Sequence, residues 1–120
     1  MTDTHALIER YIASWNETDA AGRRALISAT FTESASYSDP MMKSEGHGGI
    51  DQMLAVVQER FAGLRFKQVG KVDSYEDRVR FSWELGPDGG PSVAGGTDFA
   101  TIDAGKLSSV VCFLDFAPGA

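Results

Sequence analysis

An aspartate in the last third of the chain stands among residues that rarely surround one. The segment "SVAGGTDFATID", residues 92–103, alternates like a β-strand, so Asp98 shares one face with Ala94, Gly96, Ala100 and Ile102. An ionised carboxylate is costly to bury among small and apolar side chains, so we expect Asp98 to be protonated or paired. The glycines leave space beside it, which a ligand could fill.

Tyr11 and Asp39 are two further polar residues on otherwise apolar faces. Tyr11 lies on the apolar stripe of a predicted helix over residues 4–16, where its hydroxyl needs a buried partner. Asp39 ends the alternating segment "ESASYSDP" and shares a face with Ala35 and Tyr37. If these faces line one cavity with Asp98, it has the usual form of a small-molecule site. The chemistry most natural to a phenol and two carboxyl groups there is proton transfer next to a carbonyl.

Each of these residues also has a structural interpretation. Tyr11 could be a core tyrosine bonded to a backbone carbonyl, and Asp39 could open a turn with its carboxylate on local amides. His47 could sit near the first turn of a helix or face the pocket as an acid–base group. Asp98 could form a buried ion pair, for which the candidate partners are Arg65, Arg78 and Arg80.

The elements that would position these residues follow from periodicity. Apolar residues at helical spacing predict helices over residues 4–16 and 48–61, and Asp19 is a suitable N-cap for a short helix between them. After Gly63 the pattern is strand-like as far as the final strand "LSSVVCFLDF". This order predicts an α+β cone in which a curved antiparallel sheet wraps around the helix 48–61. The residues expected to line its pocket are Trp15, Leu54, Val57, Trp83 and Phe113.

The element order and three segments resemble a known family. "RYIASWNETD", "ASYSDP" and "GTDFATID" are similar to the nuclear-transport-factor-2-like superfamily, and most closely to its SnoaL-like and ketosteroid-isomerase-like members. The resemblance covers nearly the whole chain. It implies one cystatin-like domain over residues 1–120, with three helices packed on the curved sheet.

The resemblance also implies a role for each polar residue. Tyr11 and Asp98 fall where the isomerase has its oxyanion-binding tyrosine and its neutral, hydrogen-bond-donating aspartate. Asp39, which precedes a proline as in the isomerase, falls on the aspartate that removes the α-proton and returns it elsewhere. No cofactor is implied. The tyrosine that supports the phenol in many of these isomerases would fall near Leu54, so weaker activity is expected than in true steroid isomerases.

Two functions from different classes follow. The first is an isomerase-type enzyme, or a SnoaL-like cyclase or hydratase, acting on a small apolar carbonyl compound. The second is a non-catalytic ligand-binding or dimeric assembly module that keeps the pocket. Convergence of Tyr11, Asp39 and Asp98 in one cavity would favour the enzyme. Asp39 bonded within its own turn, or Asp98 paired with an arginine, would favour the module.

Composition limits the classes of partner and of bound group, and the first residues bear on the cellular location. The formal net charge of −6 offers no basic surface for nucleic acid or for an anionic membrane. Cys112 is the only cysteine, and His5 and His47 are the only histidines, so an internal disulfide is excluded and no metal site is supported. The start, "MTDTHALIER", lacks the pattern of a signal peptide, which predicts a cytoplasmic protein.

The strand face that points away from Asp98 predicts an oligomer. It carries Phe99 together with Val93 and Thr97, and a monomer would expose this aromatic side chain. Members of the resembled superfamily are often dimers. We therefore expect a homodimer formed through the outer face of the sheet.

Overall fold

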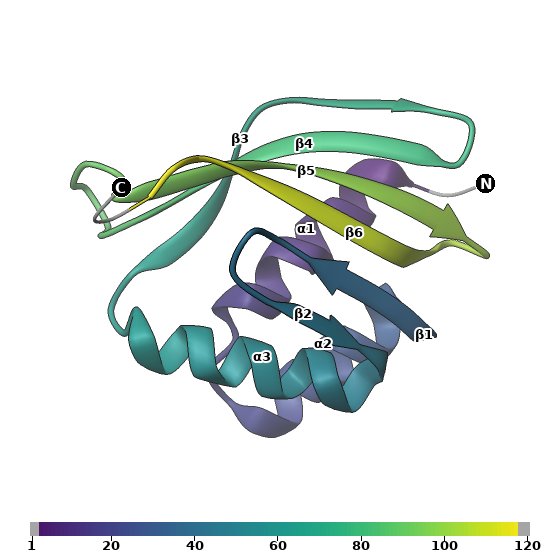
Figure 1. Cartoon of the computed structure of the whole chain (residues 1–120), viewed down its shortest axis with the longest axis horizontal. Helices are drawn as coiled ribbons and strands as arrows, with labels where there is room; N and C mark the ends of the chain where they lie inside the picture. Colours follow the sequence, from purple (N-terminus) through teal and green to yellow (C-terminus); the bar gives the residue numbers. More distant parts are fainter. Residues whose placement is uncertain (1–2, 118–120) are drawn as a thin grey trace.

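The computed structural model describes residues 3–117 as three helices packed on one side of a curved sheet (Figure 1). The helices within these residues are α1 (Thr4–Asn16), α2 (Ala20–Thr30) and α3 (Gly46–Arg60). The strands are β1 (Phe31–Ser38), β2 (Lys43–Glu45), β3 (Arg65–Tyr75), β4 (Arg78–Gly86), β5 (Ala94–Asp103) and β6 (Lys106–Phe116). The predicted α+β cone is confirmed, and α3 covers nearly the residues that periodicity indicates.

Aspartates cap the N-termini of the first two helices. The Asp3 carboxylate accepts a hydrogen bond from the backbone N–H of Ala6, and that of Asp19 accepts one from the N–H of Gly22. These contacts satisfy backbone donors that the first turn of a helix leaves without an intrahelical partner. The inward face of α1 carries Tyr11 into the interior, as its apolar stripe predicts.

The sheet has the strand order β2-β1-β6-β5-β4-β3, in which β3 to β6 form the predicted antiparallel meander. However, β1 runs parallel to β6, so the sheet is mixed and not wholly antiparallel. This ladder pairs Phe31 with Leu107, and local periodicity carries no information on the direction of strands so far apart in sequence. The segment "MMKSEG", which follows Pro40, contains β2, which pairs with β1.

A bulge in β6 decides which of its side chains face the helices. Thr101 pairs with Ser109, whereas the next residue, Ile102, pairs with Leu107, so Ser108 is an extra residue in β6. One extra residue moves all later side chains of a strand to the opposite face. The alternation of β6 therefore changes just after its start.

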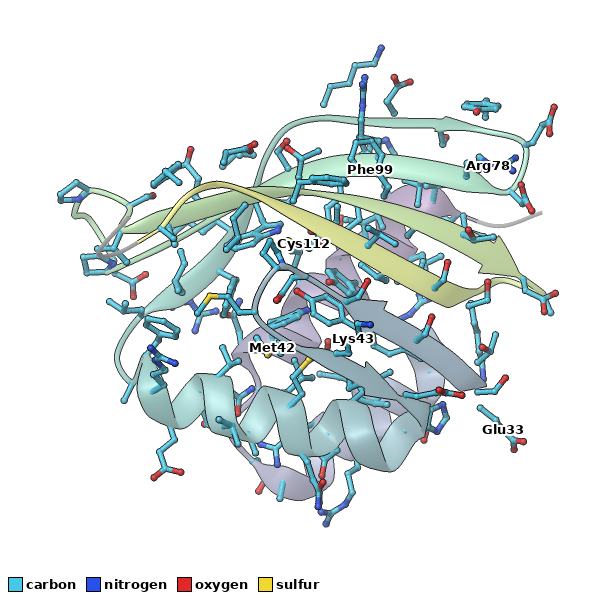
Figure 2. All side chains as sticks on the ribbon, in the orientation of Figure 1. Glu33, Met42, Lys43, Arg78, Phe99 and Cys112 are labelled. Carbon is cyan, nitrogen blue, oxygen red and sulfur yellow. The ribbon has the colours of Figure 1, made fainter. Side chains whose placement is uncertain are left out.

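Because of this change, Phe113 does not face the helices, contrary to the expectation that it lines the pocket. Cys112 is buried on the helix side of the sheet, and Phe113 is 59% exposed on the outer side. Figure 2 shows Cys112 on the inner side and Phe99 of β5 on the outer side. The Phe113 ring consequently packs against the Phe99 ring, with their centroids 5.8 Å apart.

Aromatic rings fill the space between α1 and the sheet. The Tyr11 ring meets those of Phe31 and Phe81 edge-on, with centroids 5.8 and 5.4 Å apart. Such edge-to-face contacts hold a ring in one orientation. Within residues 3–117, no helix combines the length and the apolar character needed to cross a membrane.

Candidate active site

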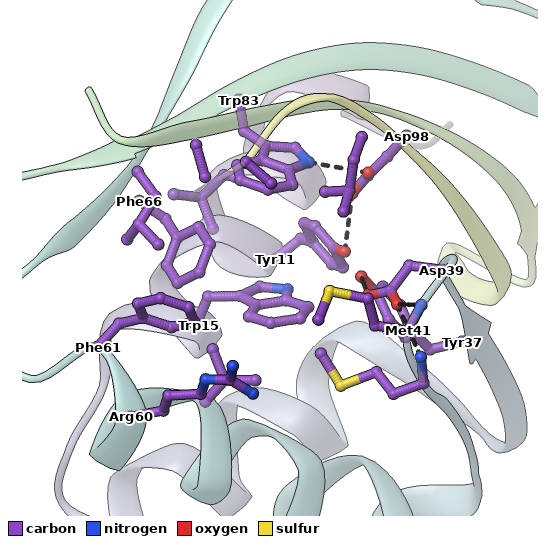
Figure 3. A pocket seen from close by; sticks show the side chains of 17 residues that line it. Tyr11, Trp15, Tyr37, Asp39, Met41, Arg60, Phe61, Phe66, Trp83 and Asp98 are labelled. Atoms are coloured by element: carbon purple, nitrogen blue, oxygen red, sulfur yellow. Dashed lines mark hydrogen bonds between the residues drawn. The ribbon is translucent and has the colours of Figure 1, made fainter. Parts of the chain in front are cut away.

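The helices and the inner face of the sheet enclose a cavity of about 150 Å³ (Figure 3). Seventeen residues line it, from α1, β1 and the β1–β2 turn, the C-terminal end of α3, strands β3 to β6 and the residue after β6. Met41 and Arg60 are exposed and lie at its rim, whereas Tyr11 and Asp98 are almost fully buried. Most of the lining is apolar, and its charged residues are Asp39, Arg60 and Asp98.

Asp98 is 1% exposed and accepts a hydrogen bond on each carboxylate oxygen. Tyr11 Oη donates to Oδ2 and Trp83 Nε1 donates to Oδ1, both over 2.9 Å (Figure 3). The predicted alternative of a buried ion pair is wrong, because none of the ion pairs among the described residues includes Asp98. Arg78 and Arg80 instead pair with carboxylates of the β3–β4 hairpin. The partners of Asp98 are neutral groups.

Burial is the main cause that raises the pKa of Asp98 above its ordinary value of 3.8. Hydrogen bonds from Trp83, Cys112 and Tyr11 act in the opposite direction, and the negative charge of Asp39 adds to the rise. Burial, followed by the charge of Asp98, raises the pKa of the Tyr11 phenol well above 10.0. Tyr11 is therefore a neutral hydrogen-bond donor at physiological pH.

The glycines beside Asp98 do not leave space for a ligand, contrary to the expectation from sequence. A Cβ atom on Gly96 would lie 2.7 Å from Cζ2 of Trp83, and one on Gly95 would lie 2.5 Å from Cε1 of Phe116. The absence of a side chain on Gly96 thus lets the Trp83 indole lie over this residue and reach Asp98. The cavity is formed elsewhere, between α1, the β1–β2 turn and the inner sheet face.

Asp39 lines the same cavity and also closes its own turn. Its Oδ1 accepts hydrogen bonds from the backbone N–H groups of Met41 and Met42, over 2.8 and 2.9 Å. Its Oδ2 accepts one from Tyr37 Oη over 2.8 Å. Asp39 thus makes the local bonds of its predicted structural role, and the structure also brings it into one cavity with Tyr11 and Asp98.

Tyr37 is a second phenol of the cavity that sequence reasoning missed as a site residue. It is buried, and burial, followed by the charges of Cys112, Asp98 and Asp39, raises the pKa of its hydroxyl. In the alternating segment "ESASYSDP", Tyr37 lies two residues before Asp39 and so shares a face with it, which is the signal that could have identified it.

Two of the five residues expected to form the apolar wall lie elsewhere. Trp15, Val57 and Trp83 line the cavity. Phe113 lies on the outer face because of the β6 bulge, and Leu54 is fully buried in the core, where it does not reach the cavity. Wall residues not expected from sequence include Phe61, Phe66, Leu85 and Leu114.

His47 lies outside this site. Nε2 of His47 is 2.9 Å from the Phe31 carbonyl oxygen, so this residue takes the structural role at the start of α3. Among the residues from 3 to 117, no group of three or more His, Cys, Asp or Glu side chains is placed to hold a metal ion.

Comparison with known proteins agrees with the fold. A family model described as a SnoaL-like domain matches residues 8–110. The chain belongs to the SnoaL-like family. A solved structure named "putative isomerase of the SnoaL-like family", from Agrobacterium tumefaciens, is 39% identical to this SnoaL-like protein with a TM-score of 0.87. The match covers 92% of this chain and 95% of that one.

More distant structures share the fold of this SnoaL-like protein. A "putative polyketide cyclase" from Sinorhizobium meliloti is 16% identical over 89% of this chain and 93% of that one, with a TM-score of 0.70. A "putative ketosteroid isomerase" from Kribbella flavida is 17% identical over 96% and 79%, with a TM-score of 0.69. Among curated proteins there is no match. The resemblance inferred from the sequence segments is thus confirmed.

Proposed function

We propose that this SnoaL-like protein is an isomerase-type enzyme that moves a proton next to the carbonyl group of a small apolar compound. The observation that carries the proposal is the buried Tyr11–Asp98 pair in an apolar cavity whose wall also carries the Asp39 carboxylate. Asp98 is enclosed by rings, whereas Asp39 lies in a turn among backbone donors. Two carboxyl groups in such different surroundings can take the separate roles of acid and base.

Tyr11 is the proposed donor to the reacting oxygen. When Asp98 is ionised, Tyr11 Oη donates to its Oδ2. When Asp98 is protonated, its O–H can donate to Tyr11 Oη, which frees the phenol hydrogen for a ligand oxygen. Trp83 Nε1 can donate to Oδ1 in both forms. In this arrangement Asp98 acts through Tyr11 and does not contact the ligand oxygen itself.

Asp39 is the proposed base. The turn amides hold its Oδ1, and Tyr37 donates to its Oδ2, which keeps a lone pair that can accept a proton. Asp39 takes the α-proton, the C–H electron pair forms the new C=C bond, and the carbonyl π pair moves to the oxygen, where Tyr11 donates. Return of the proton from Asp39 to the γ-carbon restores the carbonyl and the carboxylate, so no external acid, base or cofactor is consumed.

The size of the cavity limits the substrate. Its volume of about 150 Å³ equals that of an engineered apolar cavity that holds a single benzene ring. A four-ring steroid would extend beyond the rim. The proposed substrate is therefore a compound with one ring, or an acyclic chain of similar volume.

The test is conversion of cyclohex-3-enone to its conjugated isomer, followed by ultraviolet absorbance. We expect turnover by the unchanged protein and none above background for Asp39→Asn. Tyr11→Phe should lose about 10²- to 10³-fold in rate, the usual effect of removing one oxyanion donor. Asp88→Asn, in the exposed β4–β5 loop, is the matched control and should keep full activity.

A non-catalytic binding module is the second candidate, favoured by the three donors that already occupy the Asp39 carboxylate. The two functions differ in one result. Binding of a phenol, measured by fluorescence, without turnover of any unsaturated ketone would establish the module and end the isomerase proposal.

A further inference from the structure

Arg60 is the one cation among the described residues that line the cavity. It lies in the last turn of α3, at the rim, and its side chain is exposed. Figure 3 shows it beside Phe61 and Trp15, across the cavity from Asp98 and Asp39. The cavity therefore has an acidic end and a basic end.

Within residues 3–117 no carboxylate lies within ion-pair distance of the Arg60 guanidinium. The ion pairs of these residues use Arg23, Arg24, Arg78 and Arg80. The guanidinium carbon instead lies 5.7 Å from the ring centroid of Phe61, a distance at which the ring can orient the cation. A cation also suits the negative end of the α3 dipole, but that effect does not require a place on the cavity rim.

We propose that Arg60 binds a carboxylate carried by the ligand at the end opposite its carbonyl group. The planar guanidinium can form two parallel hydrogen bonds to one carboxylate. Asp39 would repel that carboxylate from the other end, so a ligand with this charge enters in one orientation, with its carbonyl toward Tyr11. The substrate class is thus a small apolar oxo acid, an inference that rests on the proposed function of the pocket.

The test compares acids with their uncharged amides. The probes are 4-hydroxybenzoate, 4-hydroxyphenylacetate and 3-(4-hydroxyphenyl)propanoate, each with its amide, so that the phenol mimics the enolate while the tail length varies. Quenching of protein fluorescence reports binding directly, because the protein has two tryptophans and both Trp15 and Trp83 line the cavity. We expect at least one acid to bind about three- to tenfold more tightly than its amide, with the preference falling as salt rises.

Variants assign the preference to one residue. Arg60→Gln should abolish or reverse it while leaving amide binding unchanged, and Arg60→Lys should keep part of it. Arg65→Gln, an exposed arginine that does not line the cavity, is the matched control. Equal binding of every acid and amide, or a preference that survives in Arg60→Gln, would overturn the inference while the pocket function stands. If none of the six probes binds, the pocket function itself fails, and this inference fails with it.

Discussion

Asp98 differs from an aspartate held in an ion pair because all its hydrogen-bond donors are neutral. Tyr11, Trp83 and Cys112 favour the carboxylate but bring no positive charge, so burial outweighs their combined effect on its pKa. The nearby Asp39 carboxylate acts in the same direction as burial. An acid in this environment can stay protonated at a pH at which an exposed aspartate is ionised.

This environment predicts how stability depends on pH. Because the folded pKa of Asp98 is above its ordinary value of 3.8, the contribution of its protonated form to stability is fully present below about pH 4 and is lost as pH rises through the folded pKa. Asp98→Asn has no such proton to lose. Its free energy of unfolding, measured by urea titration, should therefore rise relative to the parent between pH 4 and 8.

A suitable control is Val110→Ala, which removes buried apolar contacts in β6 without removing a titrating group. It should lower the free energy of unfolding equally across this pH range. If the difference between Asp98→Asn and the parent is just as constant, Asp98 is not the neutral acid proposed here.

At the scale of single elements, the packing of the β4 side chain Trp83 against β5 depends on Gly96. A Cβ added at Gly96 would lie 2.7 Å from the Trp83 ring and 2.8 Å from the Phe113 backbone oxygen, and the backbone oxygen cannot rotate away. Gly96→Ala should lower the free energy of unfolding by about 1–3 kcal/mol, as overpacked sites do. The same change should displace Trp83 from Asp98 and shift the tryptophan emission spectrum.

The matched substitution is Gly48→Ala in the first turns of α3, where a Cβ would meet nothing within 4 Å. Alanine there should leave stability unchanged or raise it by up to about 1 kcal/mol, because glycine is the weaker helix former. Equal effects of the two substitutions would show that Gly96 is not a packing requirement.

Local patterns predicted the elements well and their long-range relations less well. The stripe of α1 and the alternation of β5 placed Tyr11 and Asp98 toward the interior, because both depend on spacing within a few residues. The parallel β1–β6 ladder is non-local, and the bulge at Ser108 has no signal in the run "LSSVVCFLDF", which is apolar on both faces. For this reason the outward position of Phe113 could not be predicted.

The same limit applies to the candidate site. Asp98 was identified from the small residues around it. The expectation that these residues leave space for a ligand was wrong, because a tryptophan from the adjacent strand fills the space over Gly96. Arg60 ends an amphipathic helix, where a cation is common, and only its place on the rim of the cavity distinguishes it.

For the whole molecule, the outer face of the sheet still predicts a homodimer. Phe99, Val111 and Phe113 are 43%, 43% and 59% exposed on neighbouring strands β5 and β6, on the side away from the helices. We expect sedimentation to give a dimer at micromolar concentration and a monomer for Phe113→Glu. Val56→Glu, at an apolar position on α3 that is 64% exposed, should leave the dimer intact. A monomeric parent would contradict the prediction.

The position of β6 has a consequence for synthesis on the ribosome. β6 is the last of the described strands to be made, yet it lies between β1 and β5 in the sheet. Until residues 106–116 emerge, β1–β2 and β3–β5 are separate pieces with no ladder between them, and their apolar inner faces are not yet joined. Pairing of Phe31 with Leu107 spans most of the chain, and such contacts form late. The cavity therefore forms in one late step, when β6 joins the two parts of the sheet. A nascent chain stalled before β6 has an incomplete sheet, which chaperones would have to protect.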